Sequence, residues 1–421
     1  MINPKKIRYA LVMLCIALWG PLLRSCLDRL WMLDEGLVSV GKWAQLQTLI
    51  EFIGAPVSSG IAIGLTILIA QHRESEHRSI LISAYMLSLI TIIPLMILTV
   101  MYAHHLVNYI GLGTQYQSEL VLCALVGYLS IGAILLNSFL IGRNQQARAL
   151  LLMLASTIPP AMMLFAGNYF VWAHSLQAIL YCMIVVGILI HSLLIVSFLN
   201  HRKTSQQDLC NIQKYSYRLA RFIPAGISLG MLSPLSILIV RALITNDQGW
   251  DFTGHTTAIW RASDWVLSAA VSILYFHFLP QWSQAQLGAR LKQAIARTLL
   301  KLYLPCLLIL CCLIAFRNPV MGLLYGERII LPLDIALYFW MGDAMRILAA
   351  FFVAGQFILH ATKLITVLDF FSQPLFALLL FFGMTTSLEL TGIAFLGTYS
   401  LYALLCLVGL LYIESVKRKS E

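Results

Sequence analysis

The sequence predicts an all-α polytopic membrane protein with about twelve transmembrane helices. Its 421 residues are 60% hydrophobic and only 11% charged, and its mean hydropathy is +0.84. Soluble domains of ordinary composition carry about 25% charged residues. The apolar residues also form runs long enough to cross about 30 Å of hydrocarbon as helices.

These runs fall into two series of equal number. The first series covers residues 8–30, 37–70, 79–102, 118–140, 149–171 and 176–199. The second series covers residues 217–243, 254–281, 294–316, 332–361, 363–383 and 390–413. We therefore predict two six-helix bundles, formed by residues 1–205 and 206–421.

The beginnings of the two series resemble each other weakly, as expected for internal repeats of a transporter. The first helix pair reads Arg29, Asp34-Glu35-Gly36 and Trp43, and the seventh and eighth helices read Arg241, Asp247-Gln248-Gly249 and Trp260. Helix breakers such as Pro56 and Pro224 lie inside spans, where they predict bends. Chance resemblance and ordinary membrane-helix kinks remain alternatives.

The basic residues predict the orientation in the membrane. Most of the 28 Lys and Arg residues lie in connectors on one side, whereas the loops at 103–117, 171–175, 244–253 and 384–389 contain none. By the positive-inside rule, both termini are cytoplasmic. The net charge of +10 is spread over connectors, so the sequence predicts no nucleic-acid partner.

Several classes of function are disfavoured by what the sequence lacks. It contains no nucleotide-binding P-loop pattern and no connector long enough for a typical glycosyltransferase domain. The nine cysteines show no metal-ligand spacing and lie mostly in apolar runs. We therefore expect a transporter with no catalytic residue, cofactor or metal site.

Charged residues nevertheless interrupt the apolar runs. Charges at membrane depth are costly and usually mark a polar cavity with a function. The set consists of Arg24, Asp28, Arg29, Lys42, Glu51, Arg241, Arg261, Asp264, Asp343, Arg346 and Asp369.

Three acid-base pairs within this set lie three or four residues apart, on one helical face. They are Arg24 with Asp28, Arg261 with Asp264, and Asp343 with Arg346. Each pair either neutralises itself locally or contacts a polar substrate, and the sequence leaves both interpretations open.

Four residues have no such partner on their own helix. Arg29 and Arg241 occupy matching ends of the first and seventh helices, and a guanidinium group suits phosphate oxygens. Glu51 and Asp369 either couple transport to a proton or cation, or pair with a neighbouring helix.

Motifs in the second half support a family resemblance. They are Trp260 to Leu279-Pro280, Trp340-x-Gly342-Asp343-x-x-Arg346 and Asp369-x-x-Ser372-Gln373, joined by the segment 45–71 in the first half. Together they resemble the Wzx-type bacterial polysaccharide flippases, including the branch for O-antigen and enterobacterial common antigen lipid III. The segment 260–280 is about one turn shorter than in that branch, and the first helix is richer in charge.

The resemblance implies the fold of the multidrug, oligosaccharidyl-lipid and polysaccharide exporter (MOP) superfamily, with two six-helix bundles around a central cavity. It implies a flippase in the bacterial inner membrane that moves undecaprenyl-pyrophosphate-linked oligosaccharide to the periplasmic leaflet by alternating access. Its partners would be membrane lipids, a polysaccharide polymerase and a chain-length regulator.

The site residues expected under this resemblance fall into two groups. The pyrophosphate ligands would be Arg29, Arg241, Arg24, Arg261 and Arg346, and the ion-coupling or cavity residues would be Glu51, Asp369, Asp343 and Asp264. A multidrug or cation antiporter of the same superfamily, and a membrane-embedded polymerase or ligase, are the alternatives.

Overall fold

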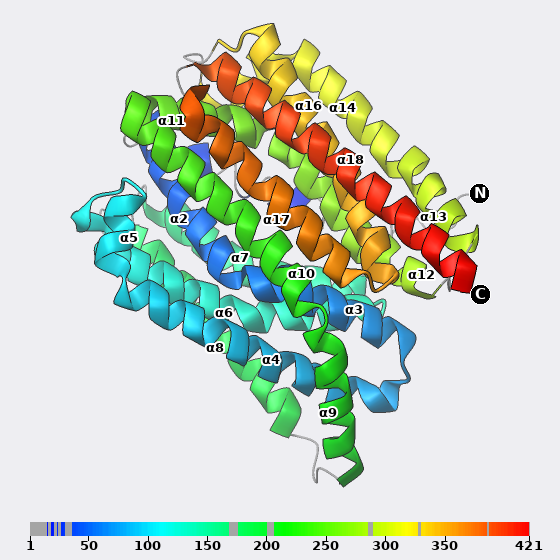
Figure 1. Ribbon diagram of the computed structural model, residues 1–421. Helices are drawn as coiled ribbons and strands as arrows, with labels where there is room; N and C mark the ends of the chain where they lie inside the picture. The colour runs from blue at the N-terminus through cyan, green and yellow to red at the C-terminus, as the bar shows by residue number, and fades with distance from the viewer. Residues whose placement is uncertain are drawn as a thin grey trace, which may run out of the picture. The chain divides into compact units, whose positions relative to one another are not determined.

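The structure is a computed structural model. It describes residues 36–167, 176–199, 206–284, 289–326, 330–384 and 387–420, and before these residues 15, 18–20, 23 and 27–29. All regular elements in this part of the chain are helices (Figure 1). The contacts divide the chain into two compact units: unit 1 comprises Met1–Gln45 and Ser236–Glu421, and unit 2 comprises Leu46–Leu235.

Within the described residues, nine helical segments are long and apolar enough to cross a membrane. One of them, Ile223–Ser283, contains a break at Gly249 and so corresponds to two predicted helices. The predicted run at 149–171 corresponds to a helix of 22 residues, Gln146–Gly167. The first predicted run lies largely outside the described residues. The all-α polytopic fold class is thus confirmed.

Unit 2 is built around one central helix. Its elements are α2 (Leu37–Pro56, which begins in unit 1), η1 (Val57–Ile61), α3 (Ala62–Gln71), α4 (Glu74–Met101), α5 (Ala103–Tyr109), η2 (Thr114–Tyr116), α6 (Gln117–Gly142), α7 (Gln146–Gly167), α8 (Leu176–Leu199), α9 (Gln206–Ala220), α10 (Ile223–Ile227) and η4 (Ser228–Leu232). Helix α6 packs against α3, α4, α7 and α8. Leu120, Ala124, Ile131 and Leu135 of α6 are completely buried, so this helix forms the apolar core of the unit.

Two distorted helices meet backbone to backbone inside unit 2. The π-helical turn η1 follows Pro56, and α10, which contains Pro224, leads into the π-helical turn η4. A Cβ atom on Gly60 would lie only 2.7 Å from the Cα of Gly226. Only glycine at both positions permits this approach, because any side chain would collide with the opposite backbone.

Unit 1 contains helices of the second predicted bundle, which pack around α16. Its elements are α11 (Ser233–Ile273, which begins in unit 2), η5 (Leu274–Phe278), α12 (Leu279–Gln284), α13 (Ala289–Thr298), η6 (Leu299–Tyr303), α14 (Leu304–Ala315), α15 (Arg317–Tyr325), α16 (Leu333–Ile358), α17 (Thr362–Leu379), η7 (Leu380–Met384) and α18 (Leu388–Ser420). Helix α16 packs against α14, α17 and α18. Its Phe339, Trp340, Phe351 and Phe357 are completely buried.

The weak sequence repeat has a counterpart in the backbone. Gly36, just before α2, has φ +72°, and Gly249, inside α11, has φ +84°. Both values lie in the left-handed region that glycine adopts without steric cost. The two predicted turns therefore use the same kind of residue for the same reason.

The predicted bundle boundary at residues 205 and 206 stays a prediction, because units defined by contacts need not coincide with bundles defined by helix order.

Candidate functional site

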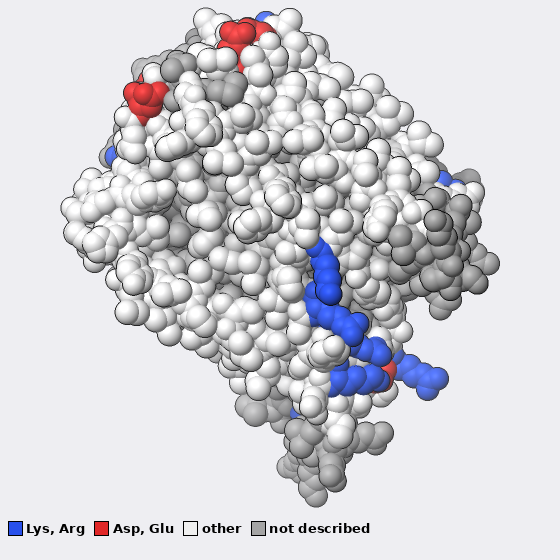
Figure 2. Space-filling view, in the orientation of Figure 1, with Lys and Arg blue, Asp and Glu red and all other residues white. Residues whose placement is uncertain are grey.

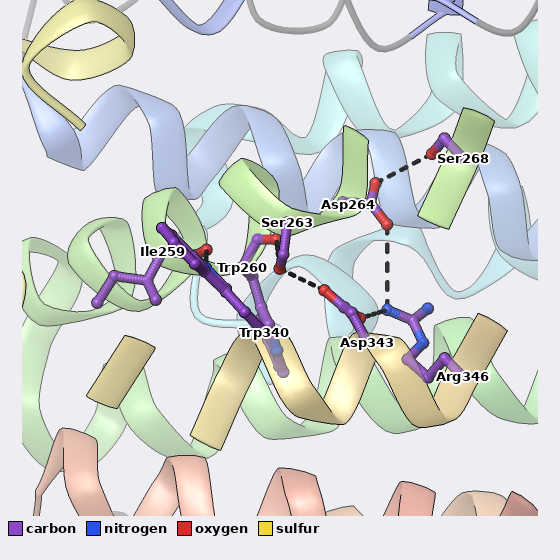
Figure 3. A network of polar contacts seen from close by, with 8 residues as sticks. All are labelled: Ile259, Trp260, Ser263, Asp264, Ser268, Trp340, Asp343 and Arg346. Atoms are coloured by element: carbon purple, nitrogen blue, oxygen red, sulfur yellow. Dashed lines mark hydrogen bonds and ion pairs between the residues drawn. The ribbon is translucent and has the colours of Figure 1, made fainter. Parts of the chain in front are cut away.

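The candidate site lies in unit 1, where the second leg of α11 runs past α16. Gly249 ends the first leg of α11, since its φ of +84° and ψ of 174° break the helix. The second leg then carries Ser263, Asp264 and Ser268, and it faces Asp343 and Arg346 of α16 (Figure 3). We call these five residues the α11–α16 network.

Asp343 is the centre of this network. Its carboxylate is completely buried and accepts a short hydrogen bond from the Ser263 hydroxyl. Its Oδ1 accepts a second hydrogen bond from Arg346 Nη1 at 2.8 Å. The same Nη1 lies 4.0 Å from Asp264 Oδ1 (Figure 3). The predicted pair of Asp343 and Arg346 is confirmed. Arg346 also forms an ion pair with the carboxylate of Asp264 on α11.

Arg261 contacts a partner far away in the sequence. Its Nη1 donates to Oδ1 of Asp28, 233 positions earlier, and these two side chains are only 7% and 0% exposed. Neither sequence-based pairing, Arg261 with Asp264 or Arg24 with Asp28, anticipated this contact. This buried ion pair joins the first apolar run to α11.

Arg241 is buried on the first leg of α11. Its Nη1 donates to the backbone carbonyl of Ala44 at 2.9 Å, and its guanidinium carbon lies 6.0 Å from the centre of the Trp260 ring. That distance is compatible with a cation–π contact. The guanidinium group is therefore held between a helix backbone and an aromatic face.

Trp260 belongs to an aromatic cluster. Its ring centre lies 5.9 Å from that of Phe339, 5.5 Å from that of Phe376 and 5.3 Å from that of Phe395. Trp340 is completely buried and donates from Nε1 to the Ile259 carbonyl at 3.1 Å. The burial of both tryptophans favours a role in helix packing.

The Trp260 indole N–H adds one polar feature to this cluster. It is buried and has no hydrogen-bond acceptor among the described residues. Buried donors are ordinarily satisfied by protein or by another molecule.

Asp369 has a partner on the neighbouring helix. The carboxylate is completely buried, and its Oδ1 accepts a hydrogen bond of 2.6 Å from the Tyr402 hydroxyl of α18. The sequence left open whether this acid pairs with another helix, and the structure supplies such a partner.

None of the contacts described above involves Arg29 or Glu51. Arg29 is exposed, unlike Arg241 at the matching end of its helix. Glu51 is exposed on α2 and belongs to unit 2, and Arg24 lies outside the described residues.

The charge balance of the unit 1 site is mixed. Its ionisable side chains are Arg241, Arg261, Arg346, Asp28, Asp264, Asp343 and Asp369. Carboxylates outnumber guanidinium groups, so composition alone does not make the site positive. The described residues contain no group of three His, Cys, Asp or Glu side chains that could hold a metal ion. The arrangement offers fixed donors and acceptors to a polar molecule, without an evident nucleophile and base pair.

Two participants escaped the sequence analysis. Tyr402 was not identified because a neutral hydroxyl in an apolar run gives no charge signal. The available signal was its helical face, which it shares with Tyr399 and Cys406. Ser263 escaped because serine is common in membrane helices. Its position between Arg261 and Asp264 was the available signal.

No family model matches the sequence, and no curated protein resembles it closely enough in sequence to count as a relative. Solved structures do resemble its fold. A MATE protein in complex with MaL6 superposes with a TM-score of 0.74 at 14% identity, covering 97% of each chain. The inward-facing form of a multidrug resistance MATE family transporter of the MOP superfamily gives 0.66 at 14% identity, covering 98% of this chain and 100% of the other.

A third structure is a MOP superfamily transporter from Pyrococcus furiosus, for which a binding pocket of reversed polarity suggests a different function. It gives a TM-score of 0.69 at 15% identity and covers 98% of this chain and 96% of the other. The chain is thus a multi-pass membrane protein with the fold of the MOP superfamily transporters. That fold agrees with the superfamily expected from the motifs and leaves the substrate to be argued from the site.

Proposed function

We propose that the protein is a flippase for undecaprenyl-pyrophosphate-linked oligosaccharide, moving it from the cytoplasmic to the periplasmic leaflet of the bacterial inner membrane. Such a substrate cannot cross hydrocarbon unaided, because its sugar and phosphate groups would lose water without compensation. A transporter of this fold would offer it a polar route by alternating access.

The observation that carries this proposal is the presence of three arginines inside the membrane-spanning helices of one unit. Arg241, Arg261 and Arg346 are restrained by the contacts of α11 and α16 described above. A guanidinium group presents a planar fork of donors that matches phosphate oxygens. The buried N–H of Trp260 supplies a further donor near Arg241, suited to a phosphate or sugar oxygen.

The carboxylates have a role in the same proposal. Asp343 accepts hydrogen bonds from both Ser263 and Arg346. Protonation of Asp343 would weaken its interaction with Arg346 and make that guanidinium group available to the substrate. Asp369 and Asp264 are further candidates for proton or cation coupling, and Arg29 and Glu51 remain candidates at exposed positions. A polysaccharide polymerase and a chain-length regulator would act on the flipped product.

The test combines gene deletion with mass analysis of lipids. In a strain without redundant flippases, loss of the protein should cause lipid-linked oligosaccharide to accumulate, and the wild type should reverse this. Arg241→Ala should fail to reverse it, because loss of one charge-assisted hydrogen bond costs about 1.5–3 kcal/mol, or roughly 10- to 150-fold in transport. Arg241→Lys should restore part of the activity, and Arg148→Gln, an exposed arginine, should behave as wild type.

Membrane levels of each variant must be compared, since Arg241→Ala also removes the bond to Ala44. If deletion causes no accumulation of any lipid-linked oligosaccharide, the proposal is wrong.

A second candidate is a multidrug or cation antiporter of the same superfamily. It is favoured by the four aspartates that accompany three arginines at the unit 1 site and by the fold shared with MATE transporters. Efflux of cationic dyes separates the two functions. Dye efflux that depends on Asp343, without any change in surface glycan, would support the antiporter.

A further inference from the structure

A basic band lies on the surface of unit 2. Its residues are Lys214, Arg218 and Arg221, which are all exposed at the end of α9 and in the turn that follows. Figure 2 shows basic side chains gathered over α9 and its junction with α10, beside a surface without charged side chains. We call these three residues the α9 basic band.

The opposite face of α9 is fixed to unit 2. Tyr215 and Leu219 are completely buried and alternate with the band residues on the helix. The Tyr215 hydroxyl donates to Glu76 Oε1 at 2.7 Å, and Ser83 Oγ donates to the Ile212 carbonyl at 2.8 Å. Because α9 is anchored to α4 in this way, its exposed face has a defined direction.

The cations of the band rest on aromatic rings. The Arg221 guanidinium lies 4.9 Å from the centre of the Tyr217 ring. Lys214 and Arg218 lie 5.3 Å and 5.8 Å from the centre of the Tyr215 ring. Such contacts restrict the side chains, and Arg218 Nη1 also lies within hydrogen-bonding distance of His72 Nε2, at 3.1 Å. The band is therefore partly organised before any ligand arrives.

Nearby acids are engaged by other groups. Glu74 pairs with Arg143 at 2.5 Å, and Glu76 accepts the hydrogen bond of Tyr215. Among the described side chains, no carboxylate forms an ion pair with a member of the band. Glu76 also interacts electrostatically with Lys214, so Arg218 and Arg221 provide most of the positive charge that is open to an external anion.

Large apolar side chains are exposed on the segment of unit 2 that follows the band. Ile227 is 43% exposed and Leu235 is 38% exposed, as expected for side chains that face lipid. The candidate membrane span that follows the band begins at Ile223, two residues after Arg221. The band therefore lies beside the end of a candidate membrane crossing.

From these observations we infer that the α9 basic band, with Tyr217, binds the phosphate of an anionic phospholipid in the adjacent leaflet. In the predicted topology this is the cytoplasmic leaflet. The lipid would hold the connector between the two predicted bundles at the membrane surface. The inference is independent of the transported substrate.

The full-length protein in detergent can be titrated with phosphatidylglycerol or phosphatidylcholine and observed by native mass spectrometry. The wild type should bind phosphatidylglycerol more tightly than phosphatidylcholine. The variant K214Q/R218Q/R221Q should lose this binding by roughly fivefold per charge, on the order of 100-fold in all. Higher salt should weaken the wild-type interaction.

The control variant R148Q/R297Q/K301Q also removes two arginines and one lysine from exposed positions. It should retain phosphatidylglycerol binding, as should the charge-preserving K214R/R218K/R221K. Equal loss in both glutamine variants would attribute binding to net charge and overturn the inference. Equal affinity for the two lipids, or binding of soluble polyglutamate in place of phosphatidylglycerol, would overturn it as well.

Discussion

Replacing Asp28 with asparagine should remove the carboxylate that contacts the buried guanidinium group of Arg261. The two side chains are 0% and 7% exposed, so water cannot easily replace the missing carboxylate. Removal of one partner from a buried ion pair costs about 3–5 kcal/mol. We expect Asp28→Asn to lower the free energy of unfolding by this amount, and Arg261→Met to lower it similarly.

The double variant D28L/R261M tests the cause of this loss. If the penalty comes from an uncompensated charge, removing both charges should restore stability to within about 1 kcal/mol of the wild type. Reversible unfolding by a denaturing detergent in mixed micelles measures all of these values, and a double-mutant cycle gives the coupling.

An exposed ion pair provides the control. Arg143 and Glu74 are 30% and 79% exposed, so Glu74→Gln should cost at most about 1 kcal/mol. If D28L/R261M instead loses the sum of the two single losses, the reasoning about the buried pair is refuted.

Three further predictions concern other parts of the molecule. Gly60→Val should reduce stability by about 1–3 kcal/mol or more, measured in the same unfolding assay, because a side chain would collide with the backbone at Gly226; no loss would contradict the close contact. Tyr402→Phe should cost about 1–3 kcal/mol by leaving Asp369 without its hydroxyl donor, and unchanged unfolding would show that the bond is unimportant. The pKa of Tyr215 is raised to about 12, mainly because the hydroxyl is buried and secondly because it donates a hydrogen bond to Glu76. Wild-type stability should therefore fall between about pH 10, where an unfolded tyrosine ionises, and pH 12, whereas Tyr215→Phe should show a smaller fall over that range.

The sequence predicted those features that depend on neighbours along the chain. Hydropathy located the helices, since crossing hydrocarbon requires an uninterrupted apolar run. The spacing of Asp343 and Arg346 predicted their ion pair because residues three apart share a helical face. Gly36 and Gly249 marked the two turns, and both have positive φ.

The missed features depend on packing between distant segments. The choice of Asp28 as partner for Arg261 was not accessible from spacing, because helix rotation and crossing decide which side chains meet. The same applies to Asp369 and Tyr402, where the partner is a neutral hydroxyl on another helix. Glu51 lies in the candidate membrane span Leu37–Gln71 with an exposed side chain, and its role in coupling stays a prediction.

Among the described residues, every buried aspartate and arginine belongs to unit 1: Asp28, Arg241, Arg261, Asp343 and Asp369. Two repeats that had kept the same interior would share such residues equally. Here unit 1 carries all the buried aspartates and arginines of the described residues, so a polar molecule bound by them would have these partners within a single unit. The specificity of transport could then change through a few substitutions on α11 and α16, while the apolar packing of unit 2 is left intact.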